Sequence, residues 1–258
     1  MADYFVEDPK YNEDIFRHRF RMSKRLFLKI VADVEENDPW FEEAPDTRGR
    51  KGFTPLQKVT SAIKQLATGN TPDENDEYLH MAERTSRECL EYFCDTVCKI
   101  YGPEFLRRPT SHDMALLYKA HEEKHHLPVF VKSIPYPHEV DQKKFKRQHE
   151  VARKDVERAF GVLKAKWSVL SRPMRARSVK KIRSVVYTCI ILHNMILKDE
   201  GKAIAPVHIR DPPVEPALDD TVLGELMDED THWRLKHDLI DHLASQDLPQ
   251  LLVDSDED

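Results

Sequence analysis

The strongest pattern in this sequence is an apolar stripe between Gln142 and Leu170. Its members recur every three or four positions, which is the spacing of one face of an α-helix; they are Ala152, Val156, Ala159, Phe160, Leu163 and Trp167. The pattern predicts the longest helix of the chain over about 142–170. A stripe of this length also requires other elements to cover it, because burial of apolar side chains away from water lowers the free energy.

Helical signals continue through most of the chain, which contains only seven glycines. Few glycines mean few tight turns, which favours long helices over a many-stranded sheet. We expect helices over about 12–36, 54–68, 74–82, 111–125, 179–197 and 235–244, and one that is capped by Thr85 and Ser86. Ser23 and the Thr54-Pro55 pair are helix-start signals, and Gly69 is a stop signal. The sequence therefore predicts a mostly α fold with little β, in which 128–137 is a short extended segment.

Two further helices have apolar faces that we expect to point inward. The helix-rich opening over 12–36 carries one apolar stripe after Ser23, formed by Leu26, Phe27, Ile30, Val31 and Val34. The helix over 179–197 carries Ile182, Val185, Val186, Cys189, Ile190, His193 and Ile196.

The helices over 54–68 and 74–82, with the one that follows Thr85, have the order of a helix-turn-helix unit. In such a unit the third helix enters a DNA groove, and Arg84 and Arg87 lie near its exposed start. The same spacing is also typical of any small helical bundle, so both interpretations stay open on this pattern alone.

Charge is distributed in two opposed blocks. Between Gln142 and Arg183 there are fifteen Lys/Arg against three acids, a net of +12, whereas 211–258 has fifteen acids against two cations, a net of −13. A basic block is typical of a polyanion-binding surface, and the acidic block can mask it. The block predicts DNA contacts from Lys143, Lys144, Lys146, Arg147, Arg153 and Lys154. Its first part, 143–147, also resembles a nuclear import signal, although a solvated helix start has the same composition.

Two other patterns have residue types that could form a chemical site. His121 and His125 form an H-E-x-x-H motif, but no third ligand pattern follows and the segment is charged, which favours an exposed helix end over a zinc site. Cys89, Cys94 and Cys98 lack a C-x-x-C pair, so buried thiols are the better interpretation. No metal site is therefore expected from these motifs.

Several segments together resemble the plant PIF/Harbinger transposases. The C-terminal matches are Ala152-Arg-Lys-Asp-Val-Glu-Arg-Ala-Phe-Gly-Val-Leu163, Trp167, Arg172-Pro173 and Cys189-Ile-Ile-Leu-His-Asn-Met195. The N-terminal matches are Gly52-Phe-Thr-Pro-Leu-Gln-Lys58, Gln65-Leu-Ala67, Asp76-Glu-Tyr-Leu79 and Phe105-Leu-Arg-Arg-Pro-Thr110. They occur in the family's order and extend over about 14–200.

The resemblance implies an N-terminal helix-turn-helix, an RNase H-like DDE domain, Mg²⁺ or Mn²⁺ as the metal, nuclear location and a Myb-like DNA-binding partner. It places the last acid of the DDE triad at Glu157. The motifs of the first two acids are missing, because Leu127-Pro128 runs directly into Val129, where the family has most of its central sheet. The pattern is that of an internal deletion, either in the gene or in the splicing of its transcript. One carboxylate cannot hold the two cations that phosphodiester cleavage needs.

These observations predict an N-terminal helical domain over 12–127, a truncated DDE remnant over 128–200 and an acidic, largely disordered tail over 201–258. The expected function is that of a transposase-derived nuclear protein without nuclease activity or a bound cofactor, which binds DNA or a transposase partner. The alternatives are an active metal-dependent DDE nuclease and a pure protein-interaction module. No apolar run approaches the roughly 20 residues that a membrane span needs, and no signal peptide is apparent, so we expect no membrane partner.

Overall fold

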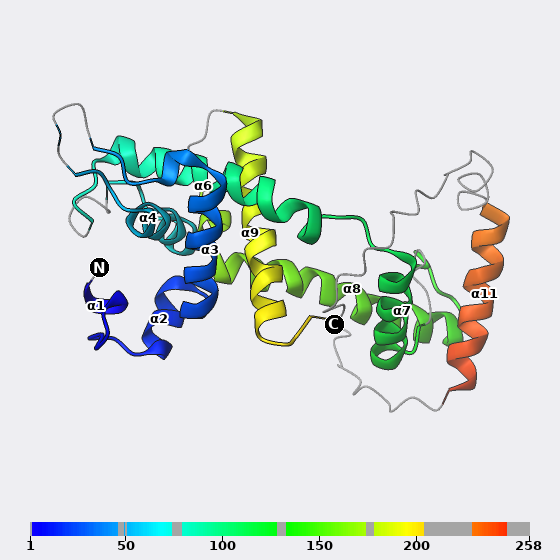
Figure 1. The fold of residues 1–258 in the computed structure, drawn as a ribbon. Helices are drawn as coiled ribbons and strands as arrows, with labels where there is room; N and C mark the ends of the chain where they lie inside the picture. The colour runs from blue at the N-terminus through cyan, green and yellow to red at the C-terminus, as the bar shows by residue number, and fades with distance from the viewer. Residues whose placement is uncertain are drawn as a thin grey trace, which may run out of the picture. The chain divides into compact units, whose positions relative to one another are not determined.

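The computed structural model describes residues 2–45, 49, 51–73, 79–127, 133–173, 178–203 and 229–246. Within these ranges every regular element is a helix, which confirms the mostly α fold (Figure 1). The elements are α1 (Ala2–Phe5), α2 (Glu13–Phe20), α3 (Lys24–Asn37), η1 (Pro39–Phe41), α4 (Pro55–Thr68), α6 (Glu83–Phe105), α7 (Ser111–His125), α8 (Val140–Lys166), η2 (Ser168–Ser171), α9 (Val179–Asp199) and α11 (Glu229–Ser245). None of the described helices combines the length and apolar character needed to cross a membrane.

The chain forms two compact units. Unit 1 contains 2–108 and 159–203, and unit 2 contains 109–158 and 229–246, within the ranges described. The boundary at 158–159 falls inside α8, so one helix contributes to both units. The boundaries of the two compact units thus differ from those of the predicted segments 12–127, 128–200 and 201–258. These segments were defined by the resemblance and by charge, and they stay a prediction.

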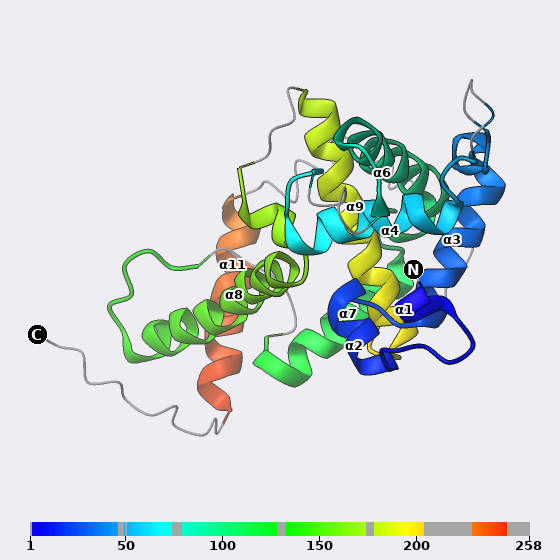
Figure 2. The same cartoon turned by 90° about the vertical axis from the view of Figure 1, so that its left-hand side faces the viewer.

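Unit 1 is organised around α6, which packs against α3, α4 and α9, as both views show (Figures 1 and 2). The predicted stripe of α3 lies in this core, where Phe27, Ile30 and Val34 are fully buried. Aromatic rings from α1 and α2 extend the core, and Phe16 stacks on Phe20 with 4.2 Å between ring centroids. Burying each such side chain contributes about 1.5–3 kcal/mol.

Local capping fixes the ends of the helices in unit 1. Ser23 accepts a hydrogen bond from the backbone of Leu26 at 3.1 Å, and Thr54 with Gln57 forms a capping box. α4 ends before Gly69, whose φ of +65° and whose close approach to the backbone of Ser168 both disfavour a side chain. These predicted starts and this stop are confirmed.

The predicted cap of α6 at Thr85 and Ser86 is wrong by three to four residues, because the N-cap is Ala82. The helix begins at Glu83, and Thr85 and Ser86 lie inside it, with no side-chain cap at Ala82. The hydroxyl of Ser86 is instead buried against Ser61 at 2.9 Å, and Gln65 donates to the Ser86 carbonyl at 2.8 Å. The hydroxyl serves the α4–α6 contact, a tertiary role that local sequence does not reveal. Of the expected helix over 74–82, residues 74–78 lie outside the described ranges, Leu79 is helical, and 80–82 are not helical.

The buried face of α9 also differs from the prediction. Cys189 and Ile196 are buried as expected, but Ile182, Val185, Val186, Ile190 and His193 are only half-buried. Ile191, Leu192 and Met195 are buried instead. Thr188 is also buried and donates to the Cys94 carbonyl of α6 at 3.2 Å, so the buried side of α9 includes a polar residue that the apolar pattern does not mark.

Unit 2 joins α7, the first part of α8 and α11. Its small core consists of Leu127, Phe145, Leu239, Ile240 and Leu243. The predicted bounds of α7 are confirmed, whereas α11 is longer than the expected 235–244. Of the segment 128–137, residues 133–137 have no regular structure and 128–132 lie outside the described ranges, as do the acidic linker at 204–228 and the tail after 246.

The apolar stripe of α8 is covered only in part. Leu163 and Trp167 are buried in unit 1, but Val156 and Phe160 are 56% and 59% exposed. The predicted helix is confirmed, with bounds at Val140 and Lys166, whereas burial of the whole stripe is wrong. The resemblance to the PIF/Harbinger transposases implies that the sheet which would pack on such a helix is missing from this chain.

Candidate nucleic-acid interface

One side of α8 in unit 2 is cationic. At 100° per residue, Lys143, Arg147 and Lys154 point in nearly the same direction, with Glu150 between them. All four side chains are exposed, whereas Phe145, on the opposite side of the helix, is fully buried in the core of unit 2. Packing of the apolar side thus fixes which cations face the solvent.

Two of the predicted DNA contacts on α8 are used within the protein. The Lys144 ammonium donates to the carbonyls of Leu243 at 2.6 Å and Gln246 at 2.9 Å. These carbonyls lie at the end of α11, where a cation stabilises the unpaired backbone acceptors. Lys146 donates to the Pro135 carbonyl at 3.1 Å.

The other predicted cations differ in their surroundings. Arg153 pairs with Glu157 at 3.4 Å on the helix surface. The ammonium groups of Lys143 and Lys154 have no hydrogen-bond or ion-pair partner in the described part of the chain. We therefore define the α8 basic face as Lys143, Arg147, Arg153 and Lys154.

The predicted contacts Arg84 and Arg87 lie in the first turns of α6, in unit 1. Both are exposed, and both pair with acids on the same helix: Arg84 with Glu88 at 3.0 Å, and Arg87 with Glu83. Pairs of this kind are worth only a few tenths of a kcal/mol, so a phosphate could replace either acid. The neighbouring carboxylates nevertheless make this end of α6 less favourable for a polyanion than the α8 basic face.

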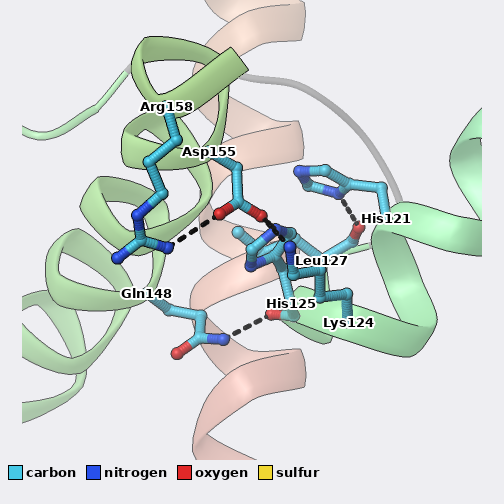
Figure 3. Close-up of polar contacts among 7 residues, drawn as sticks. All are labelled: His121, Lys124, His125, Leu127, Gln148, Asp155 and Arg158. Atoms are coloured by element: carbon cyan, nitrogen blue, oxygen red, sulfur yellow. Dashed lines mark hydrogen bonds and ion pairs between the residues drawn. The ribbon is translucent and has the colours of Figure 1, made fainter. Parts of the chain in front are cut away.

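A polar network around Asp155 holds α7 against α8 in unit 2 (Figure 3). The Asp155 carboxylate accepts from His125 Nε2 at 2.9 Å and from Arg158 at 3.0 Å, and it also pairs with Lys124. Gln148 adds a bond from α8 to the His125 carbonyl at 2.8 Å. The sequence motif around Asp155 gave no indication of this role, since Lys124 and His125 lie thirty residues earlier in the chain.

The network shifts two pKa values. The Lys124 hydrogen bond, helped by Arg158 and His125 and opposed by partial burial, lowers the pKa of Asp155 to about 2. Burial lowers the pKa of His125 below its usual range, although the hydrogen bond to Asp155 acts in the opposite direction. At neutral pH the site therefore consists of an ionised carboxylate, two cations and an imidazole that favours its neutral form.

The two histidines of the H-E-x-x-H motif both make structural bonds. His121 Nδ1 lies 2.6 Å from the Leu127 carbonyl, and His125 is bound to Asp155, as described above (Figure 3). His125 is buried, and its Nδ1 has no hydrogen-bond partner in the described ranges. These bonds fix the end of α7, where His126 takes a left-handed conformation with φ of 57°.

Glu157 does not lie in an acidic cluster. Its side chain is 64% exposed and pairs with Arg153, while Asp155, two positions away on the helix, points toward α7. Across the described residues, no three His, Cys, Asp or Glu side chains converge on one point. The residues described here thus do not fit the two-metal site that the resemblance implies, since such a site needs several carboxylates around a pair of cations.

Two family models match parts of the chain. A model described as plant transposon protein matches residues 104–204, and a domain of unknown function matches residues 1–35. Neither the curated proteins nor the solved structures gave a match. The first match extends from the end of α6 through α7, α8 and α9, and it supports a transposon-derived protein.

Proposed function

We propose that this transposon-derived chain binds the DNA backbone through the α8 basic face and does not cleave DNA. The observation that carries the proposal is the placement of Lys143, Arg147 and Lys154 on one exposed side of α8. Side chains that neutralise phosphates supply sequence-independent affinity, because they release counterions from the duplex. The resemblance adds the nucleus as the location and a Myb-like DNA-binding protein as the partner.

The absence of cleavage follows from the surroundings of Glu157. A single exposed carboxylate that is paired with Arg153 cannot hold both the attacking and the leaving oxygen through two cations. We therefore expect no cleavage of a duplex with Mg²⁺ or Mn²⁺. Metal-dependent cleavage that Glu157→Gln abolishes would instead establish the nuclease alternative.

Binding is tested by measuring duplex affinity at several salt concentrations. The Lys143→Gln/Lys154→Gln variant should bind more weakly. Its slope of log K against log salt should be less negative by roughly 2, since each phosphate contact contributes about −0.9. The matched control is Lys99→Gln/Lys119→Gln, which removes the same charge from exposed positions on α6 and α7. Equal loss in both variants would show that only net charge matters. If the folded wild-type chain binds no duplex, the interaction module becomes the better interpretation, and the exposed Val156 and Phe160 favour that alternative.

Nuclear import through 143–147 needs a variant that preserves the fold. Lys144 caps α11 and Phe145 is fully buried, so only Lys143 and Arg147 should be changed to alanine. A fluorescent fusion of this variant is expected to lose nuclear accumulation, while the Lys99→Ala/Lys119→Ala fusion keeps it. Unchanged accumulation of both fusions would show that import does not depend on Lys143 and Arg147.

A further inference from the structure

The connection between α6 and α7 contains the only two adjacent arginines of the chain, in the string Arg107-Arg108-Pro109-Thr110-Ser111. The arginines stand three and two positions before Thr110. Protein kinases that select basic substrates recognise this spacing, because carboxylates in their substrate grooves pair with the two guanidinium groups. The string therefore has the residue types and the spacing of a phosphorylation site.

The backbone of this connection has the form that a kinase groove accepts. Such a groove binds its substrate as an extended segment, in which successive side chains reach separate subsites. Residues 106–110 are not helical, and Thr110, with φ of −77° and ψ of 168°, is the last extended residue before α7. Arg108 and Pro109 are exposed. The extended part of the chain thus ends at the residue that carries the acceptor hydroxyl.

Arg107 is the less accessible of the two arginines. It is half-buried, and its guanidinium donates to the neighbouring Arg108 carbonyl at 3.2 Å in an exposed bond. An exposed hydrogen bond adds little net stability, because water replaces either partner. A carboxylate of a kinase can therefore take the place of this carbonyl.

The Thr110 hydroxyl takes part in the capping box that begins α7. It accepts from the Asp113 backbone N–H at 3.2 Å and donates to the Asp113 carboxylate at 2.9 Å. The same carboxylate accepts from the Thr110 backbone N–H at 2.7 Å. These bonds span three residues at a helix end, where local opening costs least. The residues that form the core of unit 2 lie elsewhere, so opening this turn frees the hydroxyl and leaves that core in place.

We propose that Thr110 is phosphorylated by a kinase that recognises Arg107 and Arg108, and that the phosphate opens the capping box of α7. The Thr110 oxygen attacks the γ-phosphorus of a nucleoside triphosphate that the kinase supplies. The new O–P bond forms as the bond to the β-phosphate oxygen breaks, the diphosphate leaves, and a base of the kinase takes the hydroxyl proton.

The product is incompatible with the capping box. The phosphorylated Thr110 oxygen has no proton to donate to Asp113, and the phosphate, with a charge of about −2, repels the Asp113 carboxylate. Asp113 is buried, so its carboxylate is poorly screened by water. The first turn of α7 should therefore unwind. This inference does not depend on DNA binding by the α8 basic face.

The first test is incubation of the folded full chain with ATP and a purified kinase that selects arginines at these two positions. We expect mass spectrometry to find the phosphate on Thr110. Arg107→Gln/Arg108→Gln should lower the rate roughly ten-fold or more, because charge-assisted bonds to the kinase are lost. Arg17→Gln/Arg19→Gln, an exposed pair on α2, is the matched control and should retain the rate. Thr110→Asn should take up no phosphate there and should still fold, since asparagine is an equally good helix cap.

The second test is thermal unfolding of the phosphorylated chain. Its Tm should fall by about 2–4 °C, the shift expected when one helix cap is lost in a chain of this size. The fall should be smaller in Asp113→Asn, which keeps an acceptor but removes the charge. Phosphate on Ser111 in place of Thr110, no phosphate in the folded wild type, or equal rates in wild type and Arg107→Gln/Arg108→Gln would overturn the site. An unchanged Tm would overturn the opening of the capping box.

Discussion

His125 Nε2, at the end of α7, lies 2.9 Å from a carboxylate oxygen of Asp155 in α8. One partner belongs to a zinc-like histidine motif, and the other lies in the segment that resembles the last part of a transposase DDE motif. In this fold both residues serve the packing of two helices in unit 2.

Replacing Asp155 by asparagine should destabilise unit 2. The carboxylate has three charged or polar partners, but Lys124 and Arg158 are largely exposed, so solvent weakens their share. We expect a loss of about 1–2 kcal/mol, mainly from the buried bond to His125. Urea unfolding followed by circular dichroism measures this. The matched control, Glu157→Gln, should change the free energy of unfolding by less than about 0.5 kcal/mol, as is usual for exposed positions. Equal effects of the two variants would contradict the role of the network.

Stability should fall as the pH decreases from 7.5 to 5.5. Burial lowers the folded-state pKa of His125 and of His193, so the unfolded chain binds more protons in this window. The stability that the neutral imidazoles contribute is complete above the ordinary histidine pKa of about 6.5 and is lost below it. Asp155, with a pKa of about 2, stays ionised throughout. Urea midpoints at the two pH values should differ less in His125→Gln than in wild type; an unchanged difference would show that other groups cause the dependence.

Lys58→Met should release the loop that follows α3. The Lys58 ammonium is nearly buried and donates to the carbonyls of Trp40 at 2.8 Å and Glu42 at 2.9 Å. Methionine retains the apolar stem but leaves both acceptors unpaired, at a cost of roughly 2 kcal/mol. Trp40 stacks on Tyr92, so a red shift of tryptophan emission should accompany the loss. Lys51→Met, at an exposed position, is the control; if it behaves in the same way, the buried bonds are not the cause.

Phe160→Lys should leave stability unchanged and reduce the exposed apolar surface. Phe160 is 59% exposed, whereas Trp167, on the same stripe, is fully buried. We expect a change below about 0.5 kcal/mol for Phe160→Lys and a loss of about 3–5 kcal/mol for Trp167→Ala. Binding of a hydrophobic dye, together with thermal unfolding, distinguishes the two. A large loss in Phe160→Lys would mean that the stripe is covered in solution.

Removing 247–258 should strengthen DNA binding. This segment holds five acids and no cations, and it follows α11, whose last turn is bound to Lys144. The truncation must end at Gln246, because Leu239, Ile240 and Leu243 belong to the core of unit 2. Tighter, salt-sensitive binding by the shorter chain supports masking of the α8 basic face. Phosphorylation of Ser255 in the full chain should act in the opposite direction to truncation. Equal affinity of the full and shortened chains would exclude masking.

Local sequence determined which segments are helical and, in most cases, where they begin. Ser23, Thr54 and Gly69 act through bonds or backbone angles within a few residues, so their roles follow from the chain itself. The apolar stripe of α3 was likewise sufficient to predict its buried side. Phe27, Ile30 and Val34 lie on a single apolar face, and all three are fully buried. The motif around Glu157 also showed the resemblance to transposases from sequence alone, because its residues are contiguous in the chain.

Only the tertiary structure decided which cations are available and which apolar faces are covered. Lys143 and Lys144 are neighbours of the same type, yet one faces solvent and the other caps a helix about a hundred residues later. Ser86 became part of the α4–α6 contact, and Val156 remained exposed. Helical periodicity fixes the direction of a side chain on its own helix, but its partner comes from the packing of distant segments. The energy of each contact depends on that partner. The segment of α8 and the residue after it can therefore combine a buried Trp167, the exposed apolar Val156 and Phe160, and the α8 basic face.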